Sequence, residues 1–173
     1  MKNNLSRRHF IGKATLATAG IAIIPSALKA GKTRSAGNPV RLGGPVSGKF
    51  DDPVLWVKAV KSLRYSAAVC PVPLGASSEL IRSFRSEAKR NNILISEVGV
   101  WNNMFDPDKA AREAAIKKNI ISLQLADEIG ACCCVNISGA KGEIWDGPYP
   151  GNYSKETFDQ IVDNVRHIID QVK

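Results

Sequence analysis

The sequence predicts an α/β fold in which four strand-helix units follow one another between residues 40 and 173. Four short apolar runs, several of them ended by Gly or Pro, alternate with four longer segments whose apolar residues recur at helical spacing. Because each helix returns the chain to the same end of the sheet, neighbouring strands pair in parallel through right-handed crossovers. We therefore expect parallel strands in the order 1-2-3-4.

The first two units are short. The strand "VRLGGPV" (40–46) precedes a helix within "DPVLWVKAVKSLRY" (52–65), which opens on an aspartate cap. The strand "AAVCPV" (67–72) precedes the helix "SSELIRSFRSEAKRNN" (77–92), which opens on a serine and ends at two asparagines. The apolar residues expected to face the core from the first of these helices are Val54, Leu55, Val57, Val60 and Leu63.

The last two units are longer. The strand "ILISEVGVW" (93–101) leads to a helix from about residue 107 to 129, with Gly130 as its stop. The strand "CCCVNISG" (132–139) leads through a loop to the helix 154–173. The apolar runs "ILI" and "CCCV" show little alternation, which is typical of strands covered on both faces.

The loop after the fourth strand, "WDGPYPGNY", is dense in turn formers and aromatic side chains. Its Gly and Pro residues exclude a helix or a ladder strand, yet it holds one of the three tryptophans and two of the three tyrosines of the chain. Each strand ends in such a loop, and in parallel α/β folds ligands bind at this edge of the sheet. We expect this loop to contact a ligand.

The first thirty residues are set apart from the fold. Residues 1–30 carry "SRRHFIGK" and then a weakly polar run, which resembles a twin-arginine export signal. The run is shorter than the about 18–20 apolar residues of a membrane span. We expect an exported, periplasmic protein with a linker at 31–39 and a domain at 40–173. Leu28 stands where a cleavage site needs a small residue, so an uncleaved tether is an alternative.

Most of the excess positive charge lies in that segment. The net charge is +8 for the whole chain, but residues 31–173 hold 19 bases and 16 acids, a net +3. No run of Lys and Arg with interleaved aromatics is left outside residues 1–30. The composition therefore argues against a nucleic-acid partner.

Four phrases, in order and each at a strand end, carry a resemblance to a known family: "RLGGPV", "ISEVGVWNNMFDPD", "SLQLADEIGACCCVNISG" and "WDGPYPGNYSKETFDQIVDNV". Together they resemble the first half of the sugar phosphate isomerase/epimerase group, the xylose isomerase-like TIM barrels. The resemblance covers residues 40–173 and implies a (βα)4 half of a TIM barrel that contacts a sugar or sugar phosphate.

The same resemblance implies a cofactor that this chain does not hold by itself. Such barrels have eight units and about 250 residues, and members of known chemistry bind a divalent metal (Mn, Mg, Co or Zn) through Glu, Asp, His and Glu from later strands. Those strands are not in the sequence, so no metal ligand is assigned here. A half barrel also leaves sheet edges open, which makes self-association an alternative.

Three candidate site residues lie on the third strand. By alternation Glu97 shares a face with Ile95 and Trp101, where its carboxylate could hold a sugar hydroxyl or a metal partner. An ion pair with Arg41 is the alternative. Trp101 could stack on a sugar ring and Asn102 could bond its hydroxyls, or the two could cover the core and form a turn.

Three more candidates follow from the fourth unit. Asn136, in an otherwise apolar strand, needs a polar partner, which is either a bound polyol or a neighbouring strand. Trp145 and Asp146 could lean over the mouth of the site from a stiff loop, although Asp146 could instead form an Asx turn before Gly147. We expect Trp101, Trp145, Glu97 and Asn136 to face one concavity.

Two other residue types are assigned no chemistry. Consecutive strand cysteines alternate between faces, so Cys132, Cys133 and Cys134 cannot gather around one ion with Cys70. We expect all four to be small buried apolar residues. His167 falls on the polar face of the last helix and is expected in solvent.

The leading functional hypothesis is a sugar phosphate isomerase or epimerase, which moves a proton next to a carbonyl with the help of a metal. The alternatives are an exported carbohydrate-binding module without catalysis and a half barrel that self-associates.

Overall fold

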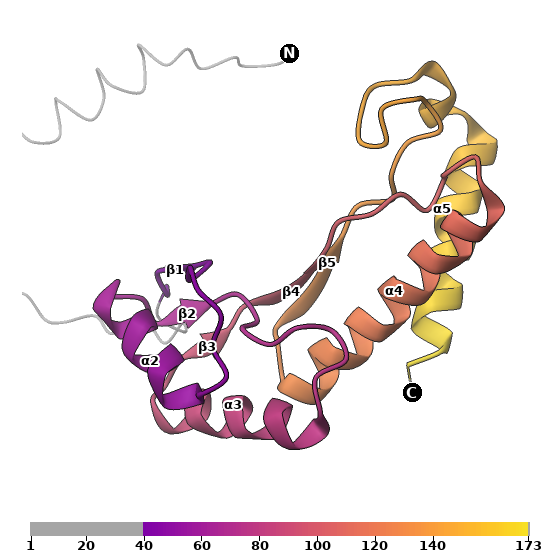
Figure 1. Cartoon of the computed structure of the whole chain (residues 1–173). Helices are drawn as coiled ribbons and strands as arrows, with labels where there is room; N and C mark the ends of the chain where they lie inside the picture. The colour runs from indigo at the N-terminus through magenta and orange to yellow at the C-terminus, as the bar shows by residue number, and fades with distance from the viewer. Residues whose placement is uncertain (1–39, 173) are drawn as a thin grey trace, which may run out of the picture. The chain divides into compact units, whose positions relative to one another are not determined.

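Four α-helices lie along one side of short parallel strands in the computed structural model, which describes residues 40–172 (Figure 1). The predicted signal segment and linker, residues 1–39, lie outside the described residues. In chain order the elements are β1 (Gly43–Gly44), α2 (Pro53–Ser62), β2 (Ala67–Ala68), α3 (Ser78–Arg90), β3 (Leu94–Ile95), β4 (Glu97–Val100), α4 (Lys109–Ile129), β5 (Cys133–Asn136), the 3₁₀ helix η1 (Pro150–Tyr153) and α5 (Lys155–Asp170).

All the strand pairs of the described residues are parallel, in the order β1-β2-β3 and β4-β5. The predicted third strand is interrupted at Ser96, so that β3 and β4 are its two halves. Backbone bonds carry the ladder across the interruption: the Cys70 N–H donates to the Glu97 carbonyl at 2.9 Å, and the Cys132 N–H to the Ile95 carbonyl at 3.0 Å. The predicted order 1-2-3-4 is confirmed.

The interruption at Ser96 changes which side chains of this strand face the helices. Ile95 is buried before it, whereas Val98 and Val100 are buried after it, and Ile95 and Val98 pack in the same core. In a regular strand, residues an odd number apart would lie on opposite faces. The prediction that Glu97 shares a face with Ile95 is therefore wrong, because Ile95 faces the helices and Glu97 faces away from them.

The helix ends follow the sequence signals closely. Asp52, Ser77 and Asp108 each accept a hydrogen bond from a backbone N–H in the first turn of the helix that follows, at 2.7, 3.2 and 2.7 Å. Gly130 ends α4 with a φ of 74°, in the left-handed region. The predicted caps at Asp52, Ser77 and Gly130 are confirmed, and the cap at Asp108 starts α4 two residues later than expected.

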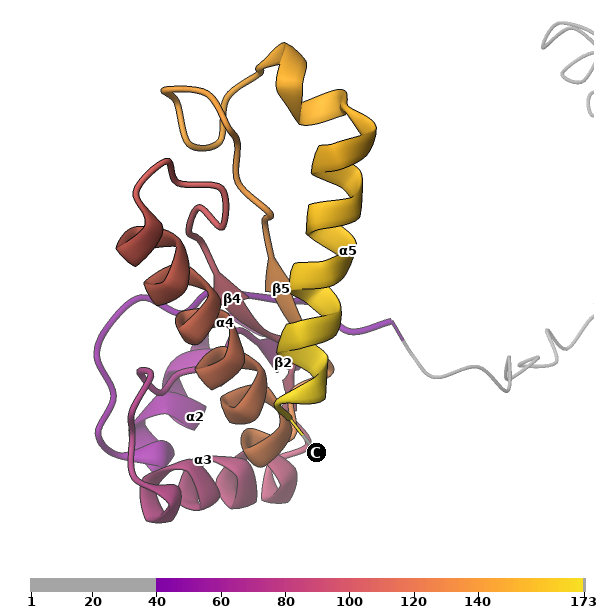
Figure 2. The ribbon, with the colours of Figure 1, turned by 90° about the vertical axis from the view of Figure 1, so that its right-hand side faces the viewer.

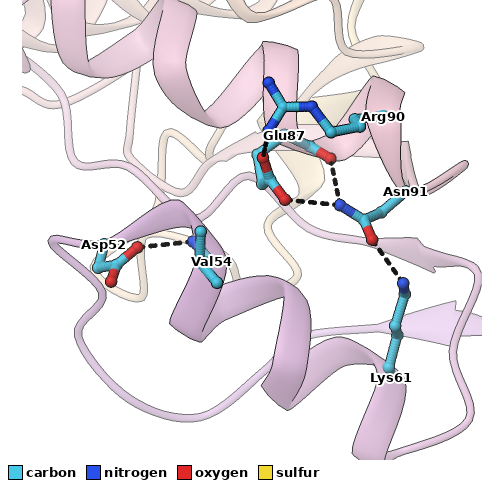
Figure 3. Close-up of polar contacts among 6 residues, drawn as sticks. All are labelled: Asp52, Val54, Lys61, Glu87, Arg90 and Asn91. Carbon is cyan, nitrogen blue, oxygen red and sulfur yellow. Dashed lines mark hydrogen bonds and ion pairs between the residues drawn. The ribbon is translucent and has the colours of Figure 1, made fainter.

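The C-terminal ends of α2 and α3 are joined by a polar cluster (Figure 3). Lys61 donates to the Asn91 side chain at 2.5 Å, and the Asn91 amide donates to the carbonyl and the carboxylate of Glu87 at 3.0 and 2.7 Å. Arg90 forms an ion pair with Glu87 at 2.6 Å. The cluster ties the two helices together at the end of the sheet away from the loops that follow β4 and β5.

The main core lies between the strands and α2, α3 and α4. Its largest side chains are Trp56 and Phe84, whose ring centroids are 5.8 Å apart. Val57 and Val60 are buried as predicted. The prediction is wrong for the other three apolar residues of α2, because the helix turns the Trp56 side inward; the three exposed residues are Val54, Leu55 and Leu63.

The last helix, α5, packs beside α4 (Figures 1 and 2). Ile168 of α5 is buried with Met104 and Ala115 in a second, smaller core. His167 is exposed, as predicted. Within residues 40–172, no helix has both the length and the apolar character that a membrane crossing requires.

The cysteine prediction is wrong for two of the four residues. Cys70 and Cys134 are half-buried against the main core, whereas Cys132 and Cys133 are exposed. In the described residues, the only strand paired with β5 is β4, which leaves the other edge of β5 open. Among residues 40–172, no helix or strand packs over the face that β5 turns away from the helices, so within this range the apolar run "CCCV" is covered on one face only.

Candidate functional site

The loops that follow β4 and β5 are joined by one asparagine, Asn103. Its Nδ2 donates to the carbonyl of Ala140 at 3.0 Å, and its Oδ1 accepts the N–H groups of Phe105 and Ala140 at 2.9 and 3.1 Å. The Met104 N–H donates to the Ser138 carbonyl at 3.2 Å. These bonds hold the two loops side by side at the carboxyl ends of the strands.

Gly139 permits this close approach. Its φ is 89°, and a β-carbon placed on it would lie 2.8 Å from the Asn103 Cα. A side chain at this position would be strained by the backbone conformation and would also collide with Asn103. The glycine in "NISG" is therefore required by the packing of one loop on the other.

The loop 145–153 is closed on itself by Asn152. The Asn152 Oδ1 accepts the Lys141 N–H at 3.0 Å, and its Nδ2 donates to the Gly147 carbonyl at 3.2 Å. The Gly147 N–H donates to the Ile144 carbonyl at 2.9 Å, forming a turn around Trp145 and Asp146. These bonds close the loop that the turn formers predict, and its stiffness stays a prediction.

One part of that prediction is wrong, because the stretch contains a turn of 3₁₀ helix. Pro150 begins η1, where the missing N–H of a proline costs no hydrogen bond. The Thr157 hydroxyl donates to the Gly151 carbonyl at 2.7 Å and anchors η1 to the first turn of α5.

Beside these loops lies a concavity of about 530 Å³. Trp101 comes to it from the end of β4, and Trp145 and Asp146 come from the loop after β5. Trp101 is 57% exposed and Trp145 is 39% exposed, so both residues present free surface. Asp146 is exposed, and its carboxylate forms no hydrogen bond with any residue in the range 40–172. The remaining lining residues are Ile137, Ser138 and Gly139.

The Trp101 ring folds back over β4. Its Nε1 lies 3.1 Å from the position that a β-carbon on Gly99 would occupy. Gly99 is on the face of β4 that turns away from the helices, so the indole covers the open face of the sheet and not the helix side. The alternative in which Trp101 covers the core is not what the structure shows.

Glu97 lies lower on the same open face. It is half-buried and stands beside Cys133 in the parallel register. The alternative ion pair with Arg41 does not form, because the Arg41 guanidinium bonds the Asn92 carbonyl at 2.7 Å and the Ser66 carbonyl at 3.1 Å. The residues that line the concavity do not include Glu97.

Asn102 and Asn136 are turned toward α4 and meet a third, buried asparagine there. Asn119, 1% exposed, donates to the Asn102 Oδ1 at 3.0 Å and accepts from the Asn136 Nδ2 at 2.9 Å. Both Asn102 and Asn119 also donate to the Ala115 carbonyl, at 3.0 and 2.9 Å. The partner that Asn136 needs is thus supplied by a helix, which neither alternative foresaw.

The expectation that Asn136 and Glu97 face one concavity is wrong. In the parallel register Asn136 stands beside Val100, which is buried under the helices, whereas Glu97 stands on the opposite face. Residues paired in this way point to the same side of a sheet. Trp101, Trp145 and Asp146 are brought together as expected, whereas Asn136, which is exposed, turns its amide to Asn119 of α4 and does not line the concavity.

The donor atoms near the concavity do not fit a divalent metal centre. Mg²⁺, Mn²⁺ and Zn²⁺ take several converging carboxylate or imidazole ligands. The lining offers one carboxylate, Asp146, and one hydroxyl, Ser138. In the part of the chain that the structure describes, no three His, Cys, Asp or Glu side chains are grouped as metal ligands.

Two solved structures are similar to this chain. One is a D-psicose 3-epimerase with D-tagatose from Clostridium cellulolyticum H10, with a TM-score of 0.52 and 17% identity over 75% of this chain and 48% of that one. The other is a 3-keto-D-glucoside 4-epimerase from E. coli in its apo form, with a TM-score of 0.52 and 13% identity over 75% of this chain and 50% of that one.

The chain has the fold of half a TIM barrel. It spans about half the length of these two proteins, and at these identities the likeness shows the fold alone. No family model matches the sequence, and no curated protein matches it either.

Sequence reasoning missed three asparagines that hold the site together: Asn103, Asn119 and Asn152. For Asn119 a signal exists, since it lies on the helical stripe of Ala115, Ser122 and Ala126, which is buried. An amide on a stripe that faces the core needs a partner from another element. Asn103 and Asn152 lie in irregular loops, where spacing says nothing about partners.

Proposed function

We propose that this chain is a sugar phosphate isomerase/epimerase-like protein whose residues 101–146 form part of a sugar-binding wall. The observation that carries the proposal is the meeting of Trp101, Trp145 and Asp146 at one concavity, at the strand ends where barrel enzymes bind ligands. The phrases shared with the family and the fold shared with two sugar epimerases support the substrate class.

The wall suits a sugar by its chemistry. The exposed faces of two indoles can pack against the C–H face of a pyranose or a linear ketose, while the Asp146 carboxylate accepts hydrogen bonds from hydroxyl groups. A volume of about 530 Å³ is in the range of small-molecule sites and exceeds that of a single hexose. The room left over suits a phosphate group or a second ring.

The reaction of the complete protein is proton transfer at the carbon next to a carbonyl. The family resemblance implies a divalent metal (Mn, Mg, Co or Zn) for such a reaction, but no metal ligand is assigned among the residues of this chain. The residues of this chain orient the substrate: Trp101 and Trp145 hold the ring, and Asp146 holds a hydroxyl. Glu97, on the open face of β4 and outside the lining of the concavity, is given no contact with the sugar in this proposal.

In this proposal Asn102 and Asn136 act by positioning. Their bonds to Asn119 fix the ends of β4 and β5 on α4, and with them the start of each loop. Neither side chain needs to touch the sugar for this role.

An alternative is a carbohydrate-binding module without catalysis. The observation that favours it is the lining itself, because two exposed tryptophans and one carboxylate are groups that can bind a sugar without a base or a metal. The basic segment before "FIGK" supports an exported, periplasmic location for either function.

A sugar titration tests the wall. Tryptophan fluorescence is followed while D-psicose, D-tagatose or fructose 6-phosphate is added to the full chain. Trp56, 1% exposed in the core, gives a constant background. We expect a saturable change that Trp101→Ala and Trp145→Ala each weaken about tenfold, because each removes one stacking surface.

Tyr153→Ala is the matched control, since Tyr153 is on the same loop, is 83% exposed and does not line the concavity. Binding that is equally strong in the two tryptophan variants would show that the wall is not the site. Sugar binding without isomerisation, also after addition of Mn²⁺, Mg²⁺ or Co²⁺, fits both the carbohydrate-binding module and the half barrel. Isomerisation of the sugar by the chain alone contradicts both hypotheses.

A half barrel that self-associates is a second alternative. The open edge of β5 and the exposed Cys132 and Cys133 support it, because a second half barrel would cover both. Sedimentation equilibrium of the full chain is expected to show a concentration-dependent dimer. A chain that stays monomeric at every concentration up to about 100 μM argues against self-association. At this limit the experiment would miss a dimer whose association free energy is weaker than about −5.5 kcal/mol.

A further inference from the structure

A second cavity, of about 520 Å³, lies between α4, α5 and the two joined loops. It shares no lining residue with the concavity of Trp101 and Trp145. The two loops that the Asn103–Ala140 hydrogen bonds join border both cavities. Figure 2 shows the two helices that flank it side by side. The residues that line it are Met104, Phe105, Pro107, Arg112, Ile116, Lys141, Gln160 and Asn164.

The charge of this cavity has one sign. Its lining contains two cations, Arg112 and Lys141, and no carboxylate. Among the residues that the structure describes, neither cation forms an ion pair. A cavity with two unpaired cations and no acid attracts an anion.

Both cations are held in place by their surroundings. The Arg112 Nη1 donates to the carbonyls of Asp106 and Pro107 at 2.6 and 2.9 Å, whereas its Nη2 and Nε make no hydrogen bond within residues 40–172. The Lys141 Nζ lies 5.6 Å from the centroid of the Phe105 ring. The guanidinium thus keeps free donors in a fixed orientation, as recognition of a phosphate requires.

The nearest acid with an observable link to Lys141 is Glu156, at the start of α5. Its pKa is lowered mainly by its own backbone N–H, then by the Ser154 hydroxyl, with a smaller effect of the Lys141 charge. Its carboxylate is exposed, does not line the cavity and forms no ion pair with Lys141 within residues 40–172.

The rest of the lining is of two kinds. Gln160 and Asn164, one turn apart on α5, offer amide donors to an oxygen-rich ligand. The apolar surface that faces the cavity comes from Pro107, which is exposed, and Ile116, which is half-buried; Met104 and Phe105, 1% and 8% exposed, lie beneath them. A bare ion would leave this apolar surface unused.

We propose that this cavity binds a small phosphate monoester, with its phosphate between Arg112 and Lys141 and its organic part against Pro107 and Ile116. The site is distinct from the sugar concavity and does not depend on the proposed function.

The test uses ¹⁵N-labelled full chain titrated with phenyl phosphate, with inorganic phosphate and benzyl alcohol as partial probes. With phenyl phosphate we expect shifts of the backbone amide resonances of residues 104–116, 141 and 160–164. The resonances of residues 145 and 146 are expected to stay unchanged. Inorganic phosphate is expected to bind at the same resonances more weakly, because it lacks the apolar contact, and benzyl alcohol is expected to cause no shift.

Lys141→Gln is expected to weaken phenyl phosphate binding about tenfold, because one charged hydrogen bond is lost. The control is Lys117→Gln, an exposed lysine of α4 outside the cavity, which should bind as the wild type does. Gln160→Ala provides a second variant with no change of charge, expected to weaken binding about threefold. Arg112→Gln is less useful, because it also removes two bonds to the backbone.

Three results would overturn the proposal: no shift with phenyl phosphate, shifts that map to another surface, or equal binding by Lys141→Gln and wild type. Trp145→Ala separates this site from the sugar wall, because it should leave phenyl phosphate binding unchanged. A failure of the sugar titration therefore leaves the phenyl phosphate result intact. A failure of the phenyl phosphate titration likewise leaves the sugar result intact.

Discussion

Replacement of Asn103 by alanine tests whether one side chain joins the loops after β4 and β5. The change removes three hydrogen bonds, of 2.9, 3.0 and 3.1 Å, and leaves the N–H and carbonyl of Ala140 without these partners. Ala140 is 1% exposed, so water cannot readily replace the lost partner. At about 0.5–1.5 kcal/mol for each bond, Asn103→Ala should lower the free energy of unfolding by about 2–4 kcal/mol.

Urea unfolding of the full chain, followed by circular dichroism, measures this loss. Gln124→Ala, at an exposed position of α4, is the control and should change the free energy by less than about 0.5 kcal/mol.

Gly139→Ala adds an independent check on the same contact. The φ of 89° and the Asn103 Cα at 2.8 Å from the added β-carbon predict a loss of at least about 1 kcal/mol. Because the new methyl group also meets the Asn103 side chain, the double variant should lose less than the sum of the two. A loss below about 0.5 kcal/mol for Asn103→Ala, or strict additivity of the pair, would refute the reasoning.

Three further predictions follow from the burial and the contacts of single residues. Asn119→Ala should lower the free energy of unfolding by about 2–4 kcal/mol, because it leaves the amides of Asn102 and Asn136 without their buried partner. A urea midpoint equal to that of wild type would contradict a stabilising role of these amide hydrogen bonds. The exposed Cys132 and Cys133 should be alkylated by iodoacetamide before Cys70 and Cys134. Burial raises the thiol pKa of Cys70 and Cys134, so their reactive thiolates form only at higher pH. Peptide mass spectrometry between pH 7 and 10 measures the order of alkylation, and equal rates for the four thiols at pH 8 would contradict the prediction. The full chain is expected to show no isomerase activity on ketohexoses with added Mn²⁺, Mg²⁺ or Co²⁺, because the donors around the concavity do not fit a metal; turnover above a buffer blank, measured by polarimetry, is the opposing result.

Much of the architecture was accessible from sequence because it depends on local interactions and on connectivity. The caps at Asp52 and Ser77 and the left-handed Gly130 involve residues close together in the chain, so their spacing alone predicts where helices start and end. The parallel order follows from the alternation of strands and helices. The same connectivity places Trp101 and Trp145 at one end of the sheet, and the structure brings them to one concavity.

The faces of the strands were decided only by the tertiary structure. A break at Ser96 lets Ile95 and Val98 both pack on the helices, which the rule of alternation excludes, and so moves Glu97 to the open face. Asn136 turns to α4 because the Oδ1 of Asn119, seventeen residues earlier, is the acceptor that its amide finds there.

The exposure of Cys132 and Cys133 was also decided by the tertiary structure. Apolar composition predicts that a strand can be buried, but the elements that pack around the strand determine whether it is buried. The sequence alone therefore determined the elements, their order and the edge that holds the site. The direction of each side chain depended on contacts between residues far apart in the chain, whose free energies no local pattern records.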